Sequence, residues 1–208
     1  MLRNAALLLT LLLSVSPSRA GQDEFELEDT VAIVVVDRDL MAHAAGGSAR
    51  KLRLEVGERL IWHGARGRIG FAVSERRLLG FHGRTGWSQL ARRVTEASTA
   101  GPELGTRIAL FVTSQRAIAF DGQWHEEALG PQEGLHTTSV GSAAALVVTR
   151  RRALGLSPSS GRFVAAKLGI HETVETARTV ASSAEVTTSK RVLFFSGASW
   201  TEQKRSLH

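Results

Sequence analysis

The sequence of 208 residues contains no cysteine, which excludes a disulfide-held fold and a cysteine nucleophile. It also lacks the HExxH, GxSxG and Walker-type glycine-rich motifs, so zincin proteases, α/β-hydrolases and P-loop enzymes are not indicated. After residue 20 no apolar run is long enough to span a membrane. Stability must therefore come from burial alone, and the remaining length suits a single domain.

The first twenty residues have the pattern of a secretory signal peptide. Arg3 supplies a positive start, "AALLLTLLLSV" is an apolar run, and Ser18 and Ala20 form a small-x-small end. The run is about half of the ~20 residues that a membrane anchor needs. We expect cleavage after Ala20 and a bacterial periplasmic or extracellular location, with no integral membrane segment in the mature chain.

Charge is distributed unevenly beyond the signal peptide. There, 24 basic residues stand against 20 acidic ones, and the acidic ones begin with a leader over residues 21–29 that holds Asp23, Glu24, Glu26, Glu28 and Asp29. From Thr30 onward the balance is 24 against 15. A basic body suits anionic lipid or polysaccharide, although an arginine-rich composition also simply keeps a protein soluble. No aromatic and basic interleaving is present, so no nucleic-acid partner is expected.

One pattern recurs along the chain: Thr/Ser-x-x-Arg-x-Leu/Ile-x-Phe/Leu, followed by an aromatic residue. It occurs in "FAVSERRLLGFHGRTGW" (71–87), "FVTSQRAIAFDGQW" (111–124), "LVVTRRRALGLSPSSGRF" (146–163) and "EVTTSKRVLFFSGASW" (185–200). A period of this length indicates a radial or stacked repeat architecture. The sequence predicts one domain over residues 30–208 with five repeats, centred on Arg38, Arg77, Arg116, Arg152 and Arg191.

Each repeat has the alternation typical of β-strands. In "RIALFVTSQRAIAF", Ile108, Leu110 and Val112 alternate with small or polar residues, and a polar turn separates them from a second alternating run. This predicts hairpins with four-residue turns from Thr to Arg, a third strand at "QWHEEAL", a candidate fourth at "GLHTTSV", and no long helix. Three residues after the arginine stand Gly80, Ala119 and Gly155, which indicates close approach of a neighbour, whereas Phe194 breaks this rule.

Glutamates also recur in register. Glu58, Glu96, Glu133 and Glu172 precede the next arginine by 19, 20, 19 and 19 residues. Because the arginine shares a face with Leu and Phe, it is expected to be half-buried and to need a charged partner. We expect structural ion pairs in the combinations Glu58 with Arg77, Glu96 with Arg116, Glu133 with Arg152, and Glu172 with Arg191. The alternative is a ring of arginines that bind a ligand.

The combination of Thr, Leu and a following Trp resembles the blade motif of tryptophan-docking β-propellers, in which a Trp joins neighbouring blades. The chain also resembles the β-flower proteins, whose hairpins surround a shallow barrel with an apolar channel. Both resemblances imply an all-β closed toroid with five-fold pseudosymmetry. The segment "EFELEDTVAIVVV" is expected to close it by supplying a strand that the last repeat lacks.

A catalytic site in a repeat protein should break the repeat. The candidates are three aspartates outside the leader, Asp37, Asp39 and Asp121, which would have to converge for glycosidase chemistry. The histidines have no shared metal spacing, and we expect no metal or cofactor. Trp62 lies outside the aromatic slot of the repeat and is the best single candidate for a ligand contact.

These observations favour an exported, non-enzymatic binding module without catalytic residues. It would hold an apolar or amphiphilic ligand such as a lipid, or an envelope protein, at the ring centre or on one face. The alternatives are a propeller-type hydrolase of envelope polysaccharide and a structural subunit of an envelope complex. Convergence of the aspartates would favour the hydrolase.

Overall fold

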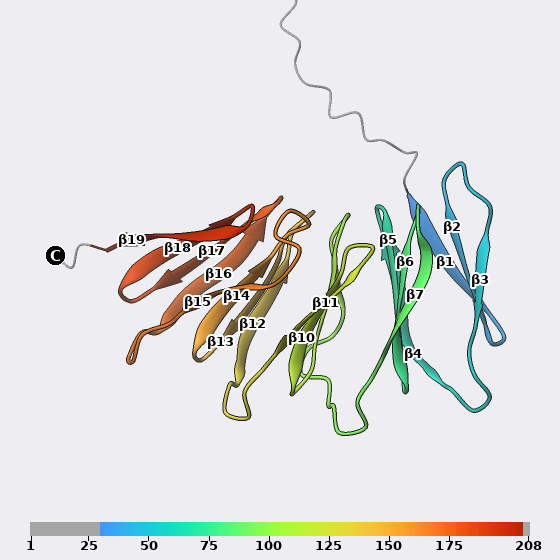
Figure 1. Ribbon diagram of the computed structural model, residues 1–208, viewed down its shortest axis with the longest axis horizontal. Coiled ribbons are helices and arrows are strands. Elements are labelled where there is room, and N and C mark those ends of the chain that lie inside the picture. Colours follow the sequence, from blue (N-terminus) through green and yellow to red (C-terminus); the bar gives the residue numbers. More distant parts are fainter. Residues whose placement is uncertain (1–29, 206–208) are drawn as a thin grey trace, which may run out of the picture.

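The protein is seen in a computed structural model that describes residues 30–205. The predicted signal peptide and acidic leader lie outside these residues. The described part consists of strands and turns, and it contains no helix of the length and apolarity that a membrane crossing requires. The all-β class and the five-repeat organisation expected from the sequence are confirmed (Figure 1).

Five antiparallel sheets follow one another along the chain. The first sheet contains β1 (Val31–Val36), β2 (Asp39–Ala44) and β3 (Arg50–Arg53). The second contains β4 (Leu60–Arg66), β5 (Ile69–Ser74), β6 (Arg77–His82) and β7 (Gly86–Ala91). The third contains β8 (Glu103–Leu104), β9 (Ala109–Val112), β10 (Arg116–Phe120) and β11 (Trp124–Ala128).

The last two sheets have the same plan of four strands joined by tight turns. The fourth contains β12 (Leu135–Val140), β13 (Ala145–Thr149), β14 (Arg152–Leu156) and β15 (Val164–Lys167). The fifth contains β16 (Val174–Val180), β17 (Ser183–Thr188), β18 (Arg191–Ser196) and β19 (Ser199–Lys204). The predicted strand at "GLHTTSV" is therefore β12, which opens the fourth sheet instead of completing the third.

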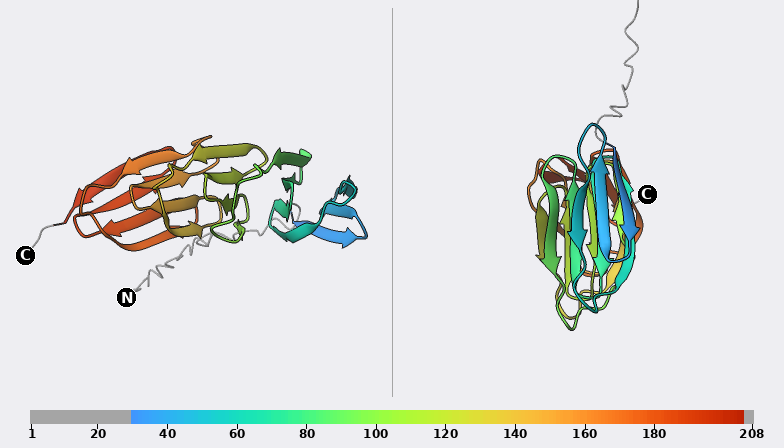
Figure 2. Two further views of the ribbon diagram at one scale, coloured as in Figure 1. Left: turned by 90° about the horizontal axis from the view of Figure 1, so that it is seen from below. Right: turned by 90° about the vertical axis from the view of Figure 1, so that its right-hand side faces the viewer.

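The sheets stack face to face in a gently curved row, with the first and fifth sheets at opposite ends (Figures 1 and 2). Closure into a toroid, which we expected from the sequence, is not seen in residues 30–205. The row curves too little for five sheets to meet, and no strand of the first sheet pairs with the fifth. The segment expected to complete the last repeat instead provides β1 of the first sheet, while the fifth sheet already has four strands.

The hydrophobic core lies between successive sheets. The central strands β5, β9, β10 and β13 are buried along their whole length, because each has a neighbouring sheet on both faces. This explains their continuous apolar sequences, since a strand covered on both sides needs no polar alternation. The first and fifth sheets bury only the face that looks into the row.

Small and large side chains fit together across each interface. The ring of Phe120 on β10 lies where a Cβ on Gly80 of the second sheet would stand, at 2.7 Å, and the ring of Phe195 lies 2.5 Å from the corresponding point on Gly155. Between the third and fourth sheets the partners are Ala119 and Leu156, which share one apolar cluster. The small residues three positions after the arginine therefore seat a large side chain of the next sheet.

Indole N–H groups join the sheets at their outer strands. Trp87 donates to the carbonyl of Arg50 in the first sheet at 3.0 Å, and Trp200 donates to the carbonyl of Val164 in the fourth at 2.8 Å. Trp124 donates to the hydroxyl of Ser88 in the second sheet at 2.9 Å. The aromatic slot of the repeat thus links each of these sheets to the one before it.

The first repeat is centred one residue later than the sequence indicated. β2 begins at Asp39, as β6, β10, β14 and β18 begin at their arginines. Leu40 and Ala42 then face the second sheet, while Asp39 and Met41 occupy the outward face. Arg38 instead belongs to the preceding turn and donates to the carbonyl of Leu54. The sequence assignment was wrong by one residue, because Leu40 lies two residues after Arg38 and so matched the leucine position of the other repeats. A shift of one residue exchanges the two faces of a strand.

The seating of Phe195 on Gly155 makes a stability prediction. The variant Gly155→Ala forces the Cβ into the Phe195 ring and should lower the free energy of unfolding by about 1–3 kcal/mol in urea denaturation. Adding Phe195→Leu should recover part of that loss, since the pair then matches Ala119 and Leu156. Equal stability of Gly155→Ala and the unmodified protein would contradict this account of the interface.

Candidate functional site

Four buried glutamate–arginine pairs occupy the junctions between sheets. In each, Nε and Nη2 of the arginine bind the two carboxylate oxygens of the glutamate in the linker before its sheet. The glutamate side chains are between 0% and 6% exposed. We call these the junction ion pairs: Glu58–Arg77, Glu96–Arg116, Glu133–Arg152 and Glu172–Arg191.

Each junction ion pair also binds the sheet before it. The Nη2 group of Arg77 donates to the carbonyl of Arg53 at the end of β3, at 3.1 Å, and Arg116 donates to Ala91 at the end of β7, at 2.9 Å. Arg152 and Arg191 repeat this contact with Ala128 and Lys167. The Nε and Nη2 groups of each arginine are thus directed at protein acceptors. We propose that these arginines serve the packing of sheets, and that they are not a ring of ligand-binding groups.

The surroundings keep these carboxyl groups ionised. Burial acts most strongly and would raise their pKa values, but hydrogen bonds from the arginine, a backbone N–H and a Ser or Thr hydroxyl outweigh it. The net result lowers the pKa of Glu58 and of Glu172 to about 2. The pKa values of Glu96 and Glu133 are lowered for the same reasons.

The three aspartates considered for hydrolysis do not converge. Asp37 and Asp39 lie at the turn between β1 and β2 of the first sheet. Asp121 follows β10 in the third sheet, at the opposite edge of the row, because equivalent strands run in the same direction. In residues 30–205 no group of three potential metal ligands is found. Asp37, Asp39 and Asp121 therefore do not form the converging set that the hydrolase alternative requires.

Asp121 instead forms a partly buried pair with His125. Its Oδ1 lies 2.9 Å from Nε2 of His125, and both side chains are at most 10% exposed. The hydrogen bond to Asp121 raises the pKa of His125, while burial opposes this, and the backbone of Gly161 in the fourth sheet adds to the rise. Since both Asp121 and Gly161 engage the ring, this histidine ties the third sheet to a loop of the fourth.

Trp62 lies on β4, where its indole packs between sheets. Its ring centroid is 6.5 Å from that of Phe71, and it belongs to the apolar cluster of the second and third sheets. The side chain also covers Gly64, at which a Cβ would meet the indole at 2.8 Å. Packing accounts for this position, and a ligand contact at Trp62 remains a prediction.

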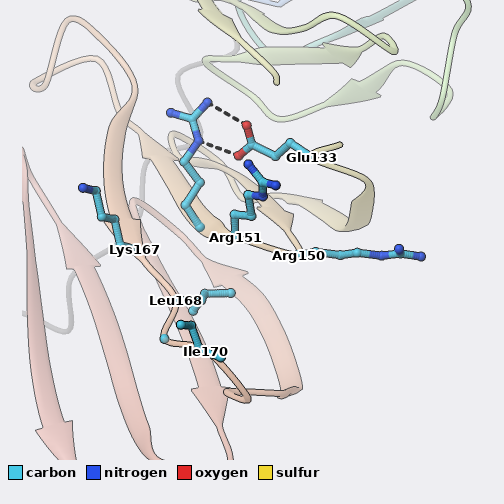
Figure 3. Close-up of a pocket in the computed structure, with 8 residues that line it drawn as sticks. Glu133, Arg150, Arg151, Lys167, Leu168 and Ile170 are labelled. Carbon is cyan, nitrogen blue, oxygen red and sulfur yellow. Dashed lines mark hydrogen bonds and ion pairs between the residues drawn. The ribbon is translucent and has the colours of Figure 1, made fainter. Parts of the chain in front are cut away.

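A groove of about 540 Å³ lies at the edge of the fourth sheet, between the β13–β14 turn and the segment that leads from β15 to the fifth sheet. A second hollow of about 270 Å³ adjoins it and shares Arg150 and Leu168. Arg150 and Arg151 project from the turn in different directions, while Lys167, Leu168 and Ile170 come from the facing segment (Figure 3). We call this the basic groove.

The cations of the basic groove lack the carboxylate partners found at an equivalent turn. In the second sheet, Arg76 pairs with Glu55 at 3.0 Å and Glu75 pairs with Arg59 at 2.7 Å. At the fourth sheet, the guanidinium group of Arg151 donates to the neutral amide of Gln132, at 3.3 Å. Within residues 30–205, Arg150 and Lys167 form no ion pair.

A fourth cation and an apolar patch complete the groove. The ammonium group of Lys190 on the β17–β18 turn donates to the carbonyl of Ile170 at 3.0 Å, which holds its charge beside the groove. The side chain of Ile170 is 83% exposed. The arginines of the two neighbouring junction ion pairs each bind one further carboxylate: Arg152 binds Glu127 and Arg191 binds Glu202. The four cations of the groove outnumber these two carboxylates. The groove therefore joins positive charge to exposed apolar surface.

Sequence reasoning did not single out this groove. The visible signal was "TRRR" at 149–152, the one hairpin turn of the five repeats with two basic residues in addition to the repeated arginine. Arg152 occupies the repeated arginine position and forms a junction ion pair with Glu133, whereas Arg150 and Arg151 are not part of the repeat pattern. The contribution of Lys167 and Lys190 depends on the stacking of two sheets, so no local pattern reveals it.

No protein-family model and no curated protein matches the sequence. Solved β-propeller structures are similar in fold. Prp20p from Saccharomyces cerevisiae matches with a TM-score of 0.42 and 7% identity, covering 80% of this chain and 55% of that one. BamB from Moraxella catarrhalis matches with a TM-score of 0.33 and 14% identity, covering 85% of this chain and 74% of that one.

A catalytically inactive virginiamycin B lyase from Staphylococcus aureus has a TM-score of 0.37 and 13% identity, with 87% of this chain and 72% of that one covered. The chain spans 55%, 64% and 54% of the lengths of the first three matching structures. At these TM-scores the likeness concerns the arrangement of strands in sheets alone.

The junction ion pairs make a prediction about acid stability. A glutamate whose folded-state pKa is lowered stabilises the fold above its unfolded pKa near 4.5, and this contribution is lost as the pH falls toward about 2. Glu58→Gln should therefore lower the free energy of unfolding by about 3 kcal/mol at neutral pH and flatten its decline below about pH 5. Urea denaturation across this pH range measures both effects.

Glu75→Gln is the matched control, because it removes an exposed carboxylate paired with Arg59 on the same sheet. That change should cost no more than about 1 kcal/mol at any pH. An acid profile of Glu58→Gln as steep as that of the unmodified protein would contradict the role assigned to the junction ion pairs.

The Asp121–His125 pair makes a prediction of opposite sign. Since the folded-state pKa of His125 is raised above 6.5, its pairing stabilises the fold fully below that value and is lost as the pH rises through the folded-state pKa. Titration by NMR should place the pKa of His125 above 6.5, and Asp121→Asn should lower it. No decrease in Asp121→Asn would show that the carboxylate is not the cause.

Proposed function

We propose that this chain is a non-enzymatic binding module that holds an anionic amphiphile in the basic groove. The observation that carries the proposal is the Arg150–Arg151 turn, whose two side chains line the groove together with Leu168 and the exposed Ile170 and have no carboxylate partner within residues 30–205. Guanidinium groups bind carboxylates and phosphates through paired N–H donors. An unpaired arginine pair beside a hollow is thus suited to an anionic head group.

The apolar side of the groove supports an amphiphile over a simple anion. Leu168 and Ile170 line the groove, and the adjoining hollow continues to Val174. An acyl chain or an aromatic group placed along these residues would bury apolar surface at about 25 cal/mol per Å². The volume of about 540 Å³ is also in the range of small-molecule sites.

The site differs from the one suggested by a closed ring. A row of sheets has no central channel, so the apolar centre of the earlier interpretation gives way to a groove at one edge (Figure 2). The hydrolase alternative loses its basis, because Asp37 and Asp39 lie far along the row from Asp121 and on the other edge. Export to the periplasm or beyond, where envelope lipids occur, remains part of the proposal through the predicted signal peptide.

Calorimetric titration of the mature protein with dodecyl phosphate, below the concentration at which it forms micelles, tests the proposal. The double variant Arg150→Gln/Arg151→Gln should bind at least about tenfold more weakly, since charge-assisted hydrogen bonds contribute about 1.5–3 kcal/mol each. Arg76→Gln is the matched control, because it changes the corresponding turn of the second sheet and should leave binding unchanged.

Two further probes separate the contributions of charge and apolar surface. Dodecyl maltoside, which has an apolar chain but a neutral head group, should bind more weakly than dodecyl phosphate. Inorganic phosphate, which has the charge but no apolar chain, should also bind more weakly than dodecyl phosphate. Equal binding of dodecyl phosphate to the double variant and to Arg76→Gln would overturn the proposal, as would no binding at all.

A further inference from the structure

The linkers between successive sheets all lie along one edge of the row, which is the lower edge in Figure 1. The hairpin turns that precede the arginine position of each repeat lie at the same edge, because equivalent strands run in the same direction. We call this the linker edge. It comprises the linkers 54–59, 92–102, 129–134 and 168–173 and the turns 37–38, 75–76, 113–115, 150–151 and 189–190.

Each linker contains a β-turn that is held by the buried glutamate of its junction ion pair. The backbone N–H of the glutamate donates to the carbonyl three residues earlier, and its carboxylate accepts from the N–H of that same residue. For Glu58 the partner is Glu55, at 3.1 and 2.8 Å. Gly57 and His171, at the second central position, have φ of 75° and 60°, as type II turns require. The junction ion pairs therefore also fix the shape of these turns.

An apolar residue occupies the first central position of each of these turns, with its side chain in solvent. Val56 and Ile170 are 81% and 83% exposed, Val94 is fully exposed, and Pro131 is exposed at the equivalent position. Proline suits this position because its φ matches the turn, but β-branched residues are typical of strands and not of turns. One exposed valine would need no explanation, whereas the same feature at four junctions does. We call these four residues the turn tips.

The two edges of the row differ in exposed apolar side chains. Among the large apolar residues of the described part, Val56, Val94 and Ile170 are the most exposed, and no other exceeds 59%. At the opposite edge, the turns within residues 30–205 contain no exposed Val, Leu, Ile, Met, Phe or Trp. Exposed apolar tips are therefore a property of the linker edge and not of turns in general.

Positive charge accompanies the turn tips. Apart from the junction ion pairs, the linkers and turns of this edge carry eight cations and three acids. The cations are Arg38, Arg59, Arg76, Arg92, Arg93, Arg150, Arg151 and Lys190, and the acids are Asp37, Glu55 and Glu75. Glu55 and Glu75 are already paired with arginines. Arg92 and Arg93 directly precede Val94, and Lys190 donates to the carbonyl of Ile170 at 3.0 Å, so cations lie beside the tips.

We infer that the linker edge docks on the surface of an anionic lipid bilayer, with the turn tips in the head-group region. Binding at a membrane surface grows with the apolar area that is buried and with the attraction of cations to anionic lipids, and this edge supplies both. Stacked sheets lie about 10 Å apart, so the tips are spread along the edge. A protein partner would favour one contiguous apolar patch, whereas a bilayer can receive separate tips.

The docking does not rest on ligand binding in the basic groove. The groove opens at the same edge and includes the tip Ile170, but Val56 and Val94 do not line it. Substitutions at these two valines therefore test the docking alone.

Co-sedimentation of the mature protein with vesicles of phosphatidylglycerol and phosphatidylcholine in equal parts tests the docking. Binding should weaken with added salt and on vesicles of phosphatidylcholine alone, because the cations then lose their attraction. The double variant Val56→Ser/Val94→Ser should bind the anionic vesicles at least about tenfold more weakly, since two apolar contacts are lost.

Val34→Ser/Val180→Ser is the matched control. These valines are 58% and 59% exposed, and they lie on β1 and at the far end of β16, outside the linker edge. This variant should bind like the unmodified protein. No binding to the anionic vesicles, or equal weakening by the two double variants, would overturn the inference.

Two further measurements separate docking by this edge from other causes. Because the chain has no cysteine, Val94→Cys and Val180→Cys can each carry one environment-sensitive fluorophore. Anionic vesicles should shift the emission to the blue at position 94 and not at position 180, and an equal shift at both would overturn the orientation. Val56→Ser/Val94→Ser should still bind dodecyl phosphate like the unmodified protein. Equal loss of vesicle and dodecyl phosphate binding would assign the effect to the fold and overturn the role of the turn tips.

Discussion

The burial of one carboxylate at each junction is the constraint on which the structure depends. A charged glutamate removed from water needs compensation for its lost hydration, and here a bidentate arginine, a hydroxyl and a backbone N–H provide it. The same guanidinium reaches the end of the preceding sheet, so satisfying the charge also fixes the distance between sheets. Ion pairs of this kind add specificity of position more than net stability.

Apolar complementarity then acts along the rest of each interface. Gly80 and Gly155 admit the phenylalanines of the following sheets, and the indole N–H groups of Trp87 and Trp200 connect the outer strands. These requirements leave the hairpin turns free to vary. The Arg150–Arg151 turn shows the consequence, because it carries two cations that no junction needs and that the proposed ligand site uses.

Much of the fold could be predicted from the sequence, because the repeat encodes local contacts. The alternation in each hairpin, the turn from Thr113 to Arg116 and the small residue at Gly80 all depend on neighbours at fixed spacing. The arrangement of the ends could not be predicted in this way. Closure depends on the accumulated rotation between sheets, which no residue specifies, and the register of the first repeat was obscured because Arg38 lies next to the equivalent position, Asp39. The basic groove likewise arises only where Lys167 and Lys190 meet the turn of another sheet.

The central claim is that the five sheets of residues 30–205 form an open row in which the first and fifth sheets do not meet. Small-angle X-ray scattering of the mature protein, at a concentration low enough for it to be monomeric, tests this most directly. The account predicts the scattering of an elongated particle whose length is set by the stacked sheets. A compact, disc-shaped particle with the first and fifth sheets in contact would contradict it.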